Sequence, residues 1–300
     1  MKNEMPFLSV ITPAYNRGDL LKTCYGSLRG QTVYDFEWIV VDDGSTDHTP
    51  EVMKRIADEE ERFPVIYVRK ENGGKHTALN ASHPYIRGRY VLILDSDDQL
   101  TADAVETVRH EWRQYENDQD TGILVFLKQN PQHVLCAYAK DEYQPVDLLK
   151  YKRTCVLSSD CCEVMRSELF RKYAFPVYEG ERFLAETALW YRAGLEKRCR
   201  YINRPVYICE YHEDGLTKSG RKMRIRNPLG GQYTSHLRMN PRCRPEERVR
   251  AALLFVCYGY FAGKKSGQIL REGSPYRLLT ALCLLPGKLM YISWRKKYWK

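Results

Sequence analysis

The chain has 300 residues, enough for one large domain or two modest ones with a sizeable core. A hydrophobic content of 43% and a charged content of 28% are those of a globular protein and argue against a disordered or fibrous chain. The net charge of +9 is uneven, because residues 221–300 hold 18 Lys and Arg against 3 Asp and Glu, which leaves residues 1–220 net acidic. We expect this basic segment to meet an anionic partner such as phospholipid, or else to present solvated helix faces.

The sequence predicts neither a leader nor a membrane span. Residues 1–6 contain no apolar core, and nowhere do 18 uninterrupted apolar residues occur. The ten cysteines lack the spacing of a disulfide framework, so we expect reduced thiols and a cytoplasmic protein. No module for base or strand contact is recognisable in the basic segment, so nucleic acid is not an expected partner.

The first hundred residues alternate between strand and helix patterns. Apolar strands are predicted at 7–12, 36–41, 65–68 and 90–94, with the first stopping at Pro13, and helices at 19–28, 49–60 and 75–81. This alternation implies a parallel, doubly wound sheet whose strands all point their carboxyl ends to one edge. Ligands of such sheets bind at that edge.

The pattern after residue 121 is less regular. It predicts strands at 123–127, 134–138 and 201–209, and helices at 163–173, 183–195 and 246–260. Residues 221–228 are expected to form a basic loop. Residues 276–294 are leucine-rich and are expected to break at Pro286-Gly287-Lys288.

Three carboxylates follow directly on the buried strand at 90–94, in the sequence Asp95-Ser96-Asp97-Asp98. Charge is costly inside such a strand, so these acids are expected just beyond its carboxyl end. An oxygen-rich, sulfur-free cluster suits Mg²⁺ or Mn²⁺, which bridge protein carboxylates to substrate phosphates. The alternative is a solvated acidic loop that caps the helix beginning near Thr101.

Three acid- or amide-bearing segments resemble, in order and spacing, the signatures of family 2 glycosyltransferases with the GT-A fold. They are residues 12–17, 41–47 and 94–98, and Asn72-Gly73-Gly74, Asn80 and Gly88-Arg89-Tyr90 fit the same pattern. The resemblance points to bacterial enzymes that build surface polysaccharides. It implies an α/β, Rossmann-like mixed sheet flanked by helices, with a catalytic domain at 1–220, divided into a nucleotide-binding half at 1–115 and an acceptor half at 116–220, and a basic helical extension at 221–300.

The same resemblance assigns nucleotide contacts. Asp43 is expected to accept a hydrogen bond from the imide of uracil, with Pro13 and Tyr15 lining the base and ribose pocket. Asp95 and Asp97 are expected to hold Mn²⁺ or Mg²⁺, with Asp95 also near the ribose. Lys75 either touches phosphate or sugar or belongs to a solvated helix start, and Tyr15 could serve in packing alone.

Inverting transfer needs a base that deprotonates the acceptor hydroxyl. The family commonly uses the Asp of a Glu-Asp pair followed by Trp at plus four and Arg at plus six; here Trp190 and Arg192 match, and Glu186 occupies the base position. This is a departure from the family pattern, and Glu181 is the alternative. His212 lies where some relatives place a late metal ligand, although a single histidine can equally be structural. Four cations could clamp the diphosphate or remain solvated: Arg221, Lys222, Arg224 and Arg226.

The resemblance therefore implies an inverting, divalent-metal-dependent glycosyltransferase. Its donor is expected to be a nucleotide diphospho-sugar, UDP-linked, and its acceptor a glycan or lipid-linked saccharide. The protein is expected at the inner face of the cell membrane, held peripherally by its basic, leucine-rich end, unless that end packs on the catalytic domain. Two other interpretations remain: a nucleotidyltransferase, and a catalytically silent nucleotide-sugar-binding protein docked at a membrane.

Overall fold

The computed structural model describes residues 5–150, 161–209 and 220–299. The chain forms two compact units. The first comprises residues 1–147, 151–174 and 196–211, and the second comprises residues 148–150, 175–195 and 212–300. The boundaries of these units differ from the predicted boundary at residue 220. The division into a catalytic domain and a basic extension stays a prediction.

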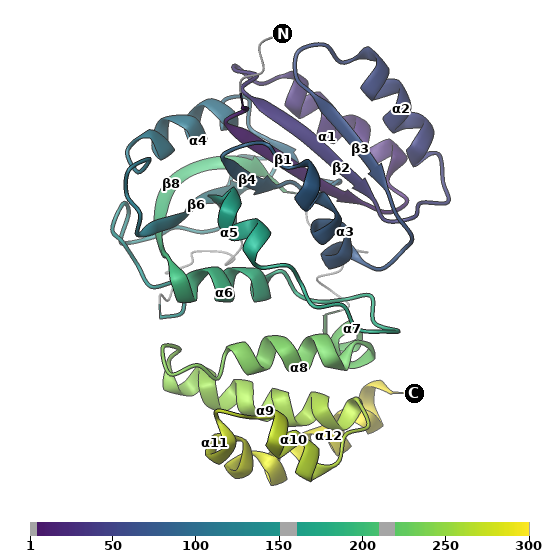
Figure 1. Ribbon diagram of the computed structural model, residues 1–300, viewed down its shortest axis with the longest axis vertical. Helices are drawn as coiled ribbons and strands as arrows, with labels where there is room; N and C mark the ends of the chain where they lie inside the picture. Colours follow the sequence, from purple (N-terminus) through teal and green to yellow (C-terminus); the bar gives the residue numbers. More distant parts are fainter. Residues whose placement is uncertain (1–4, 151–160, 210–219, 300) are drawn as a thin grey trace. The chain divides into compact units, whose positions relative to one another are not determined.

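The first unit contains a mixed sheet of eight strands within the described residues (Figure 1), in the spatial order β3-β2-β1-β4-β7-β6-β8-β5. β1 to β4 are parallel, β7 runs antiparallel to both of its neighbours, and β6 and β8 are parallel to each other. The fold is therefore the mixed α/β sheet that the sequence predicts. The strand bounds are β1 Leu8–Ala14, β2 Phe36–Asp42, β3 Val65–Arg69, β4 Tyr90–Ile93, β5 Gln99–Leu100, β6 Thr121–Gln129, β7 Cys161–Arg166 and β8 Arg198–Ile208.

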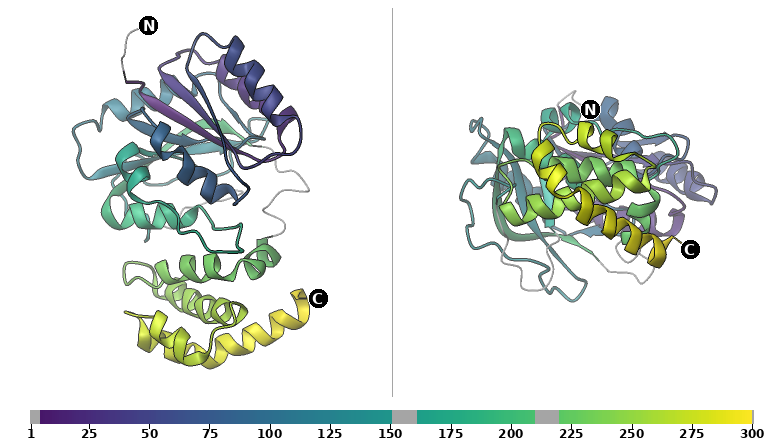
Figure 2. Two further views of the ribbon diagram at one scale, coloured as in Figure 1. Left: turned by 45° about the vertical axis from the view of Figure 1, so that its right-hand side comes forward. Right: turned by 90° about the horizontal axis from the view of Figure 1, so that it is seen from below.

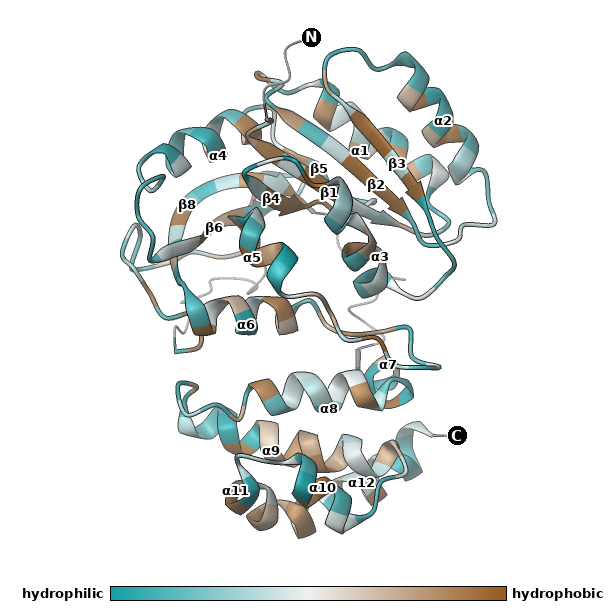
Figure 3. Cartoon of the chain, viewed as in Figure 1, coloured by the Kyte–Doolittle hydropathy of each residue, from teal (hydrophilic) through white to brown (hydrophobic). Residues whose placement is uncertain are grey.

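Helices cover both faces of the parallel strands. One face shares a core with α1 (Gly18–Arg29), α2 (Thr49–Glu59) and α4 (Ala104–Arg113), to which β2 contributes the alternate residues Phe36, Trp38 and Val40. On the opposite face α3 (Lys75–Ser82) packs on β1 and β2 (Figure 1). The 3₁₀ turn η1 (His83–Tyr85) and α5 (Ser167–Lys172) complete the helices of this unit. The central strands are its most hydrophobic part, as Figure 3 shows.

β1 continues through Pro13 to Ala14, so the predicted stop at Pro13 is wrong. Pro13 lies opposite Val41 of β2. The missing N–H of Pro13 costs little. The backbone N–H and C=O groups of alternate β1 residues point toward β4, and the pairing of β1 with β4 has already ended at Ile11, so no hydrogen bond to β4 is lost at Pro13. The strand can therefore carry Ala14 and the following turn out to the carboxyl edge.

Two predictions in the second half of the sheet are wrong. The helix predicted at 163–173 is a strand up to Arg166 and a helix only from Ser167, because β7 hydrogen-bonds to β4 on one side and to β6 on the other. Residues 134–138 form no strand: Leu135 makes one isolated bridge to Gln129. At β7 pairing across the sheet overrides the local pattern, whereas residues 134–138 lack the continuous pairing that a strand requires.

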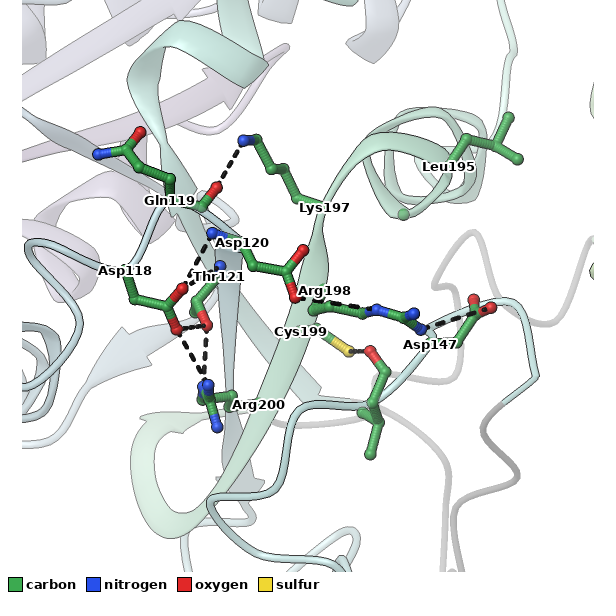
Figure 4. Close-up of polar contacts among 12 residues, drawn as sticks. Asp118, Gln119, Asp120, Thr121, Asp147, Leu195, Lys197, Arg198, Cys199 and Arg200 are labelled. Carbon is green, nitrogen blue, oxygen red and sulfur yellow. Dashed lines mark hydrogen bonds and ion pairs between the residues drawn. The ribbon is translucent and has the colours of Figure 1, made fainter.

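A polar network fixes β8 to the start of β6 (Figure 4). The Asp118 carboxylate accepts hydrogen bonds from the Thr121 hydroxyl at 2.7 Å and from the Arg200 guanidinium at 2.9 Å. Arg198 lies 3.8 Å from the Asp147 carboxylate. These contacts hold β8 in register, and β8 in turn supplies a side chain to the site described below.

The second unit is helical. It contains α6 (Thr187–Glu196), α7 (Gly220–Arg226), α8 (Pro228–Leu237), α9 (Pro245–Phe261), α10 (Ser266–Glu272), α11 (Arg277–Leu282) and α12 (Leu284–Tyr298). Helix α9 packs against both α8 and α12 (Figures 1 and 2). Among the described helices, none combines the length and the hydropathy that a membrane crossing requires.

Two predictions for the second unit are corrected. The basic segment predicted as a loop at 221–228 forms α7, since Lys and Arg are good helix formers, and Ile225 anchors it. The break expected at Pro286-Gly287-Lys288 does not occur, because Pro286 lies in the first turn of α12, where its missing N–H costs nothing. Gly287 instead allows close packing, since a Cβ there would lie 2.6 Å from the Val256 side chain.

Candidate active site

The carboxyl ends of β1, β2 and β4 bring the predicted acids to one edge of the sheet. β2 and β4 both pair with β1 in parallel, one on each side. The turn after β2 therefore carries Asp43, and the turn after β4 carries Asp95, Asp97 and Asp98, on the two flanks of Ala14 and Tyr15. This agrees with the convergence expected from the sequence.

The turn after β1 is locked to the turn after β2. Asn16 adopts a left-handed backbone with φ of 54°, a conformation that asparagine tolerates better than most residues. Its side-chain oxygen accepts a hydrogen bond from the Thr46 amide at 2.8 Å, and its own amide donates to the Ser45 hydroxyl at 2.9 Å. Pro13 is buried in β1, whereas the Tyr15 side chain next to this lock is 45% exposed and accessible to a ligand.

Asp43 is buried and organises the Gly-Gly turn that precedes α3. Its carboxylate accepts hydrogen bonds from the Lys70 ammonium at 2.7 Å and from the amides of Gly73 at 3.0 Å and Gly74 at 2.6 Å. Gly74 has a φ of 93°, which side chains rarely adopt. Lys70 and Gly73 contact Oδ1, where the Thr77 hydroxyl also lies 3.5 Å away, and Gly74 contacts Oδ2. A carboxylate has about four acceptor positions, so a second position on Oδ2 remains for a further donor such as a base imide.

Helix α3 joins the two acidic turns. The Gly74 amide donates to Asp43, and the ammonium of the next residue, Lys75, pairs with Asp95. Two neighbouring residues of the chain thus contact the ends of β2 and β4. Lys75 thus links α3 to the acid cluster rather than being a simple solvated helix start, and its contact with phosphate or sugar stays a prediction.

The acid cluster is braced from β8 by Tyr207, which the sequence reasoning missed. The Tyr207 hydroxyl accepts a hydrogen bond from the Asp95 amide at 3.0 Å and donates one to Asp98 Oδ2 at 2.8 Å. Lys128 of β6, opposite Tyr207 in register, holds its ammonium 4.0 Å from the centre of the Tyr207 ring. No local motif marks Tyr207 or Lys128, because only the pairing of β6 with β8 brings them here.

The environments of Asp95 and Asp98 shift their pKa values in opposite directions. Burial, reinforced by the charge of Asp95, raises the pKa of Asp98 to about 7. Burial also acts to raise the pKa of Asp95, but the charges of Lys75 and Lys128 outweigh it and hold that pKa below its ordinary value. Asp97, which lies between them in the sequence, is half-buried like Asp95.

The donor set fits a hard divalent cation. Asp95 and Asp97 offer carboxylate oxygens at an edge where negative charge has accumulated, and such oxygens are the ligands that Mg²⁺ and Mn²⁺ prefer. Within the described residues, no three His, Cys, Asp or Glu side chains form a ready protein cage for a metal. A cation that is shared with substrate phosphates needs only one or two carboxylates from the protein.

The expected base lies in the second unit. Glu186 directly precedes α6 and is half-buried, and its carbonyl accepts a hydrogen bond from the Leu189 amide at 2.8 Å. Glu181, the alternative, instead accepts hydrogen bonds from the Leu229 and Gly230 amides at 2.6 and 2.8 Å, which satisfies the N-terminus of α8. His212, the predicted late metal ligand, lies outside the described residues.

Solved structures share this fold. S. aureus TarS (residues 1–349), in a crystal structure with UDP-GlcNAc, matches with a TM-score of 0.64 at 17% identity, over 97% of this chain and 92% of that one. The fold is thus the GT-A arrangement that the sequence predicts. Residues 9–174, more than half of the chain, match the model described as glycosyl transferase family 2, and the chain belongs to this family.

Two curated relatives are similar over part of their length. A hyaluronan synthase of Pasteurella multocida is 39% identical over 110 residues, which are 37% of this chain and 11% of that protein. The glycosyltransferase GlyA of Streptococcus pneumoniae is 26% identical over 223 residues, which are 70% of this chain and 31% of that protein. The chain thus spans less than a third of either relative.

Proposed function

We propose that this protein transfers a sugar from a nucleotide diphospho-sugar, most simply a UDP-sugar, to a hydroxyl of a glycan or lipid-linked acceptor during bacterial surface-polysaccharide synthesis. The observation that carries the proposal is the link made by α3, whose neighbouring residues Gly74 and Lys75 contact Asp43 and Asp95. One nucleotide can therefore meet both acidic turns. Membership of family 2 and the UDP-GlcNAc complex of TarS support the choice of donor.

The donor is held by the residues of the sheet edge. Asp43 uses its remaining acceptor position for the imide of the base, and the exposed ring of Tyr15 packs on the base or ribose beside Pro13. Asp97, with Asp95, holds Mn²⁺ or Mg²⁺, which when bound neutralises charge on the departing diphosphate. His212 is a further candidate ligand by its place in the sequence. Lys75 offers a second positive charge at the same edge.

The reaction is an inverting displacement. Glu186 takes the proton of the acceptor hydroxyl as that oxygen forms a bond to the anomeric carbon of the sugar. The bond between the anomeric carbon and the diphosphate oxygen breaks, and the nucleoside diphosphate leaves with that electron pair. Glutamate can serve where relatives carry aspartate, because its extra methylene extends its reach.

A donor screen tests this function. The full chain is incubated with Mn²⁺, a panel of UDP- and GDP-sugars and a mixture of saccharide acceptors, and free nucleoside diphosphate is measured with and without acceptor. We expect acceptor-stimulated release of UDP from one UDP-sugar. Release of pyrophosphate from a nucleoside triphosphate and a sugar phosphate would show a nucleotidyltransferase instead, and donor binding without turnover across the panel would show a silent binding protein.

A further inference from the structure

The outer side of α11 and α12 carries a row of exposed apolar side chains, which we call the leucine row. The side chains are strongly exposed: Leu278 77%, Leu282 70%, Leu285 69%, Leu289 58% and Ile292 41%. Their spacing of four, three, four and three residues places them on one helical face. The row continues from α11 into α12 across Cys283, the one turn residue between the two helices.

The leucine row is not the packing face of these helices. Within the second unit the opposite face of α12 meets α9, where the Tyr291 ring lies 4.8 Å from the Phe261 ring and the Trp294 ring lies 6.3 Å from that of Tyr258. Gly287 fits closely against Val256 on the same face. Helix α12 is therefore apolar on both sides, and soluble proteins rarely leave such a continuous apolar strip in water without a partner.

The charges beside the leucine row indicate which partner fits. Five exposed cations accompany it, namely Arg277, Lys288, Arg295, Lys296 and Lys297. No Asp or Glu occurs from residue 273 to residue 300, and the preceding acid, Glu272, is paired with Lys264 at 2.6 Å. Trp299 packs its ring 5.6 Å from that of Phe261 but stays 51% exposed, and such aromatic rings favour a lipid headgroup region.

A second copy of the chain is a poor occupant for this row. Helices that pair along a leucine seam place opposite charges beside it, whereas two copies of this segment bring only cations together. Anionic lipid supplies both missing components, an apolar interior for the leucines and negative headgroups for the flanking cations. We propose that the leucine row docks α11 and α12 in the plane of an anionic lipid surface.

This inference goes beyond the transfer reaction and lies within the second unit, so vesicle binding tests it whether or not the protein transfers sugar. The full chain is sedimented with vesicles of phosphatidylcholine containing phosphatidylglycerol, and with vesicles of phosphatidylcholine alone. We expect binding to the anionic vesicles only, weakened by added salt. Equal binding to both vesicles, or to neither, would overturn the proposal.

Two variants test the two components. Leu285→Gln with Leu289→Gln should weaken binding to the anionic vesicles by more than about tenfold. Replacing Arg295, Lys296 and Lys297 by Gln should weaken it by roughly fivefold for each charge removed. Both sets are exposed, so the unfolding temperature should stay that of the parent protein, which distinguishes lost docking from lost folding.

Matched controls carry the same chemical changes elsewhere. Val177→Gln with Val249→Gln alters side chains that are 63% and 47% exposed in the same unit, and replacing Lys54, Arg55 and Arg113 by Gln removes three exposed charges from α2 and α4. Both controls should bind anionic vesicles like the parent. The proposal fails if the controls lose binding as the test variants do, or if the leucine variant dissociates a dimer in solution while vesicle binding is absent.

Discussion

A single hydroxyl group, that of Tyr207, ties together the two ends of the Asp95–Asp98 turn. It accepts from the Asp95 amide and donates to the Asp98 carboxylate, and the ring is fully buried. We expect Tyr207→Phe to lower the free energy of unfolding by about 1–3 kcal/mol, because both partners lose a buried hydrogen bond. Urea denaturation measures this loss.

The same variant should also weaken UDP binding in the presence of Mn²⁺, since the turn that carries Asp97 loses its support. Tyr85→Phe is the control, because Tyr85 is 41% exposed and lies in η1 away from this turn. If both variants have the stability and the UDP affinity of the parent, Tyr207 has no positioning role.

Substitutions at Glu186 and Glu181 should have different effects, the first on the rate of transfer and the second on stability. Glu186→Gln should reduce transfer by roughly 10²- to 10⁴-fold while leaving donor affinity unchanged, because an amide cannot accept the proton of the acceptor hydroxyl. Steady-state transfer rates and donor calorimetry measure the two effects. A Glu186→Gln enzyme that transfers sugar at the parent rate would exclude this residue as the base.

Glu181→Gln is the matched change for Glu186→Gln. Its carboxylate caps α8 through two backbone amides, so the substitution should cost about 1 kcal/mol of stability and leave the transfer rate within a few-fold of the parent. Loss of transfer in Glu181→Gln with intact stability would reverse the two assignments.

At the scale of elements, the start of α3 depends on the backbone of Gly74. Its φ of 93° and ψ of 160° lie in a region that is essentially reserved for glycine. We expect Gly74→Ala to cost about 1–3 kcal/mol of stability and to weaken UDP binding, because the amide that donates to Asp43 must move. Calorimetry with UDP and thermal unfolding provide the measurements.

Gly26→Ala is the corresponding control in α1. A Cβ at this position meets no atom within 4 Å, so alanine should raise stability by about 0.5–1 kcal/mol with unchanged UDP affinity. Equal effects of the two substitutions would mean that the Gly74 conformation has no special importance.

The stability that the junction of β6 and β8 contributes should fall at low pH. The Thr121 hydroxyl, and then the Arg200 guanidinium, hold the pKa of Asp118 well below its ordinary value. A depressed pKa contributes stability above the pKa of the unfolded chain, about 3.9, and that contribution is lost as the pH falls below it. Asp118→Asn should therefore be less stable than the parent at pH 7, and the difference should shrink below about pH 4.

Asp120→Asn is the control for this pH dependence, since Asp120 is 66% exposed and lies 4.0 Å from Arg198. Denaturant titrations of both variants across pH 3 to 7 provide the comparison. A difference between Asp118→Asn and the parent that stays constant with pH would contradict the assignment.

The elements that sequence reasoning predicts best are those whose hydrophobic pattern is local. The strands near residues 36–41 and 90–94 and the helix near 19–28 lie within a few residues of their expected positions. The helix predicted at 163–173 is correct only from Ser167, because residues 163–166 form a strand through pairing with β4 and β6, which the local pattern does not reveal. The predicted end of the first strand at Pro13 is wrong for a related reason. Whether β1 can contain a proline there depends on where β4 stops pairing with it.

At the scale of the whole molecule, the sequence predicts the acidic residues of the site better than the residues that hold them in place. Asp43 and Asp95 follow from short motifs at strand ends, and the structure brings them to one edge. Lys70, Lys128 and Tyr207 come from strands that are distant in sequence or from a loop with no motif, so only the folded sheet shows them. The role of Glu186 stays a prediction of the sequence.

The central claim is that the acids after β2 and β4 bind one nucleotide together with a divalent cation. Calorimetric titration of UDP into the parent protein, Asp43→Asn and Asp97→Asn, each with Mn²⁺ and with a chelator, tests it most directly. We expect the tightest binding in the parent with Mn²⁺, and a loss of at least about tenfold in affinity in both variants and in the parent with chelator. Undiminished UDP binding by both variants, or by the parent in chelator, would contradict the account.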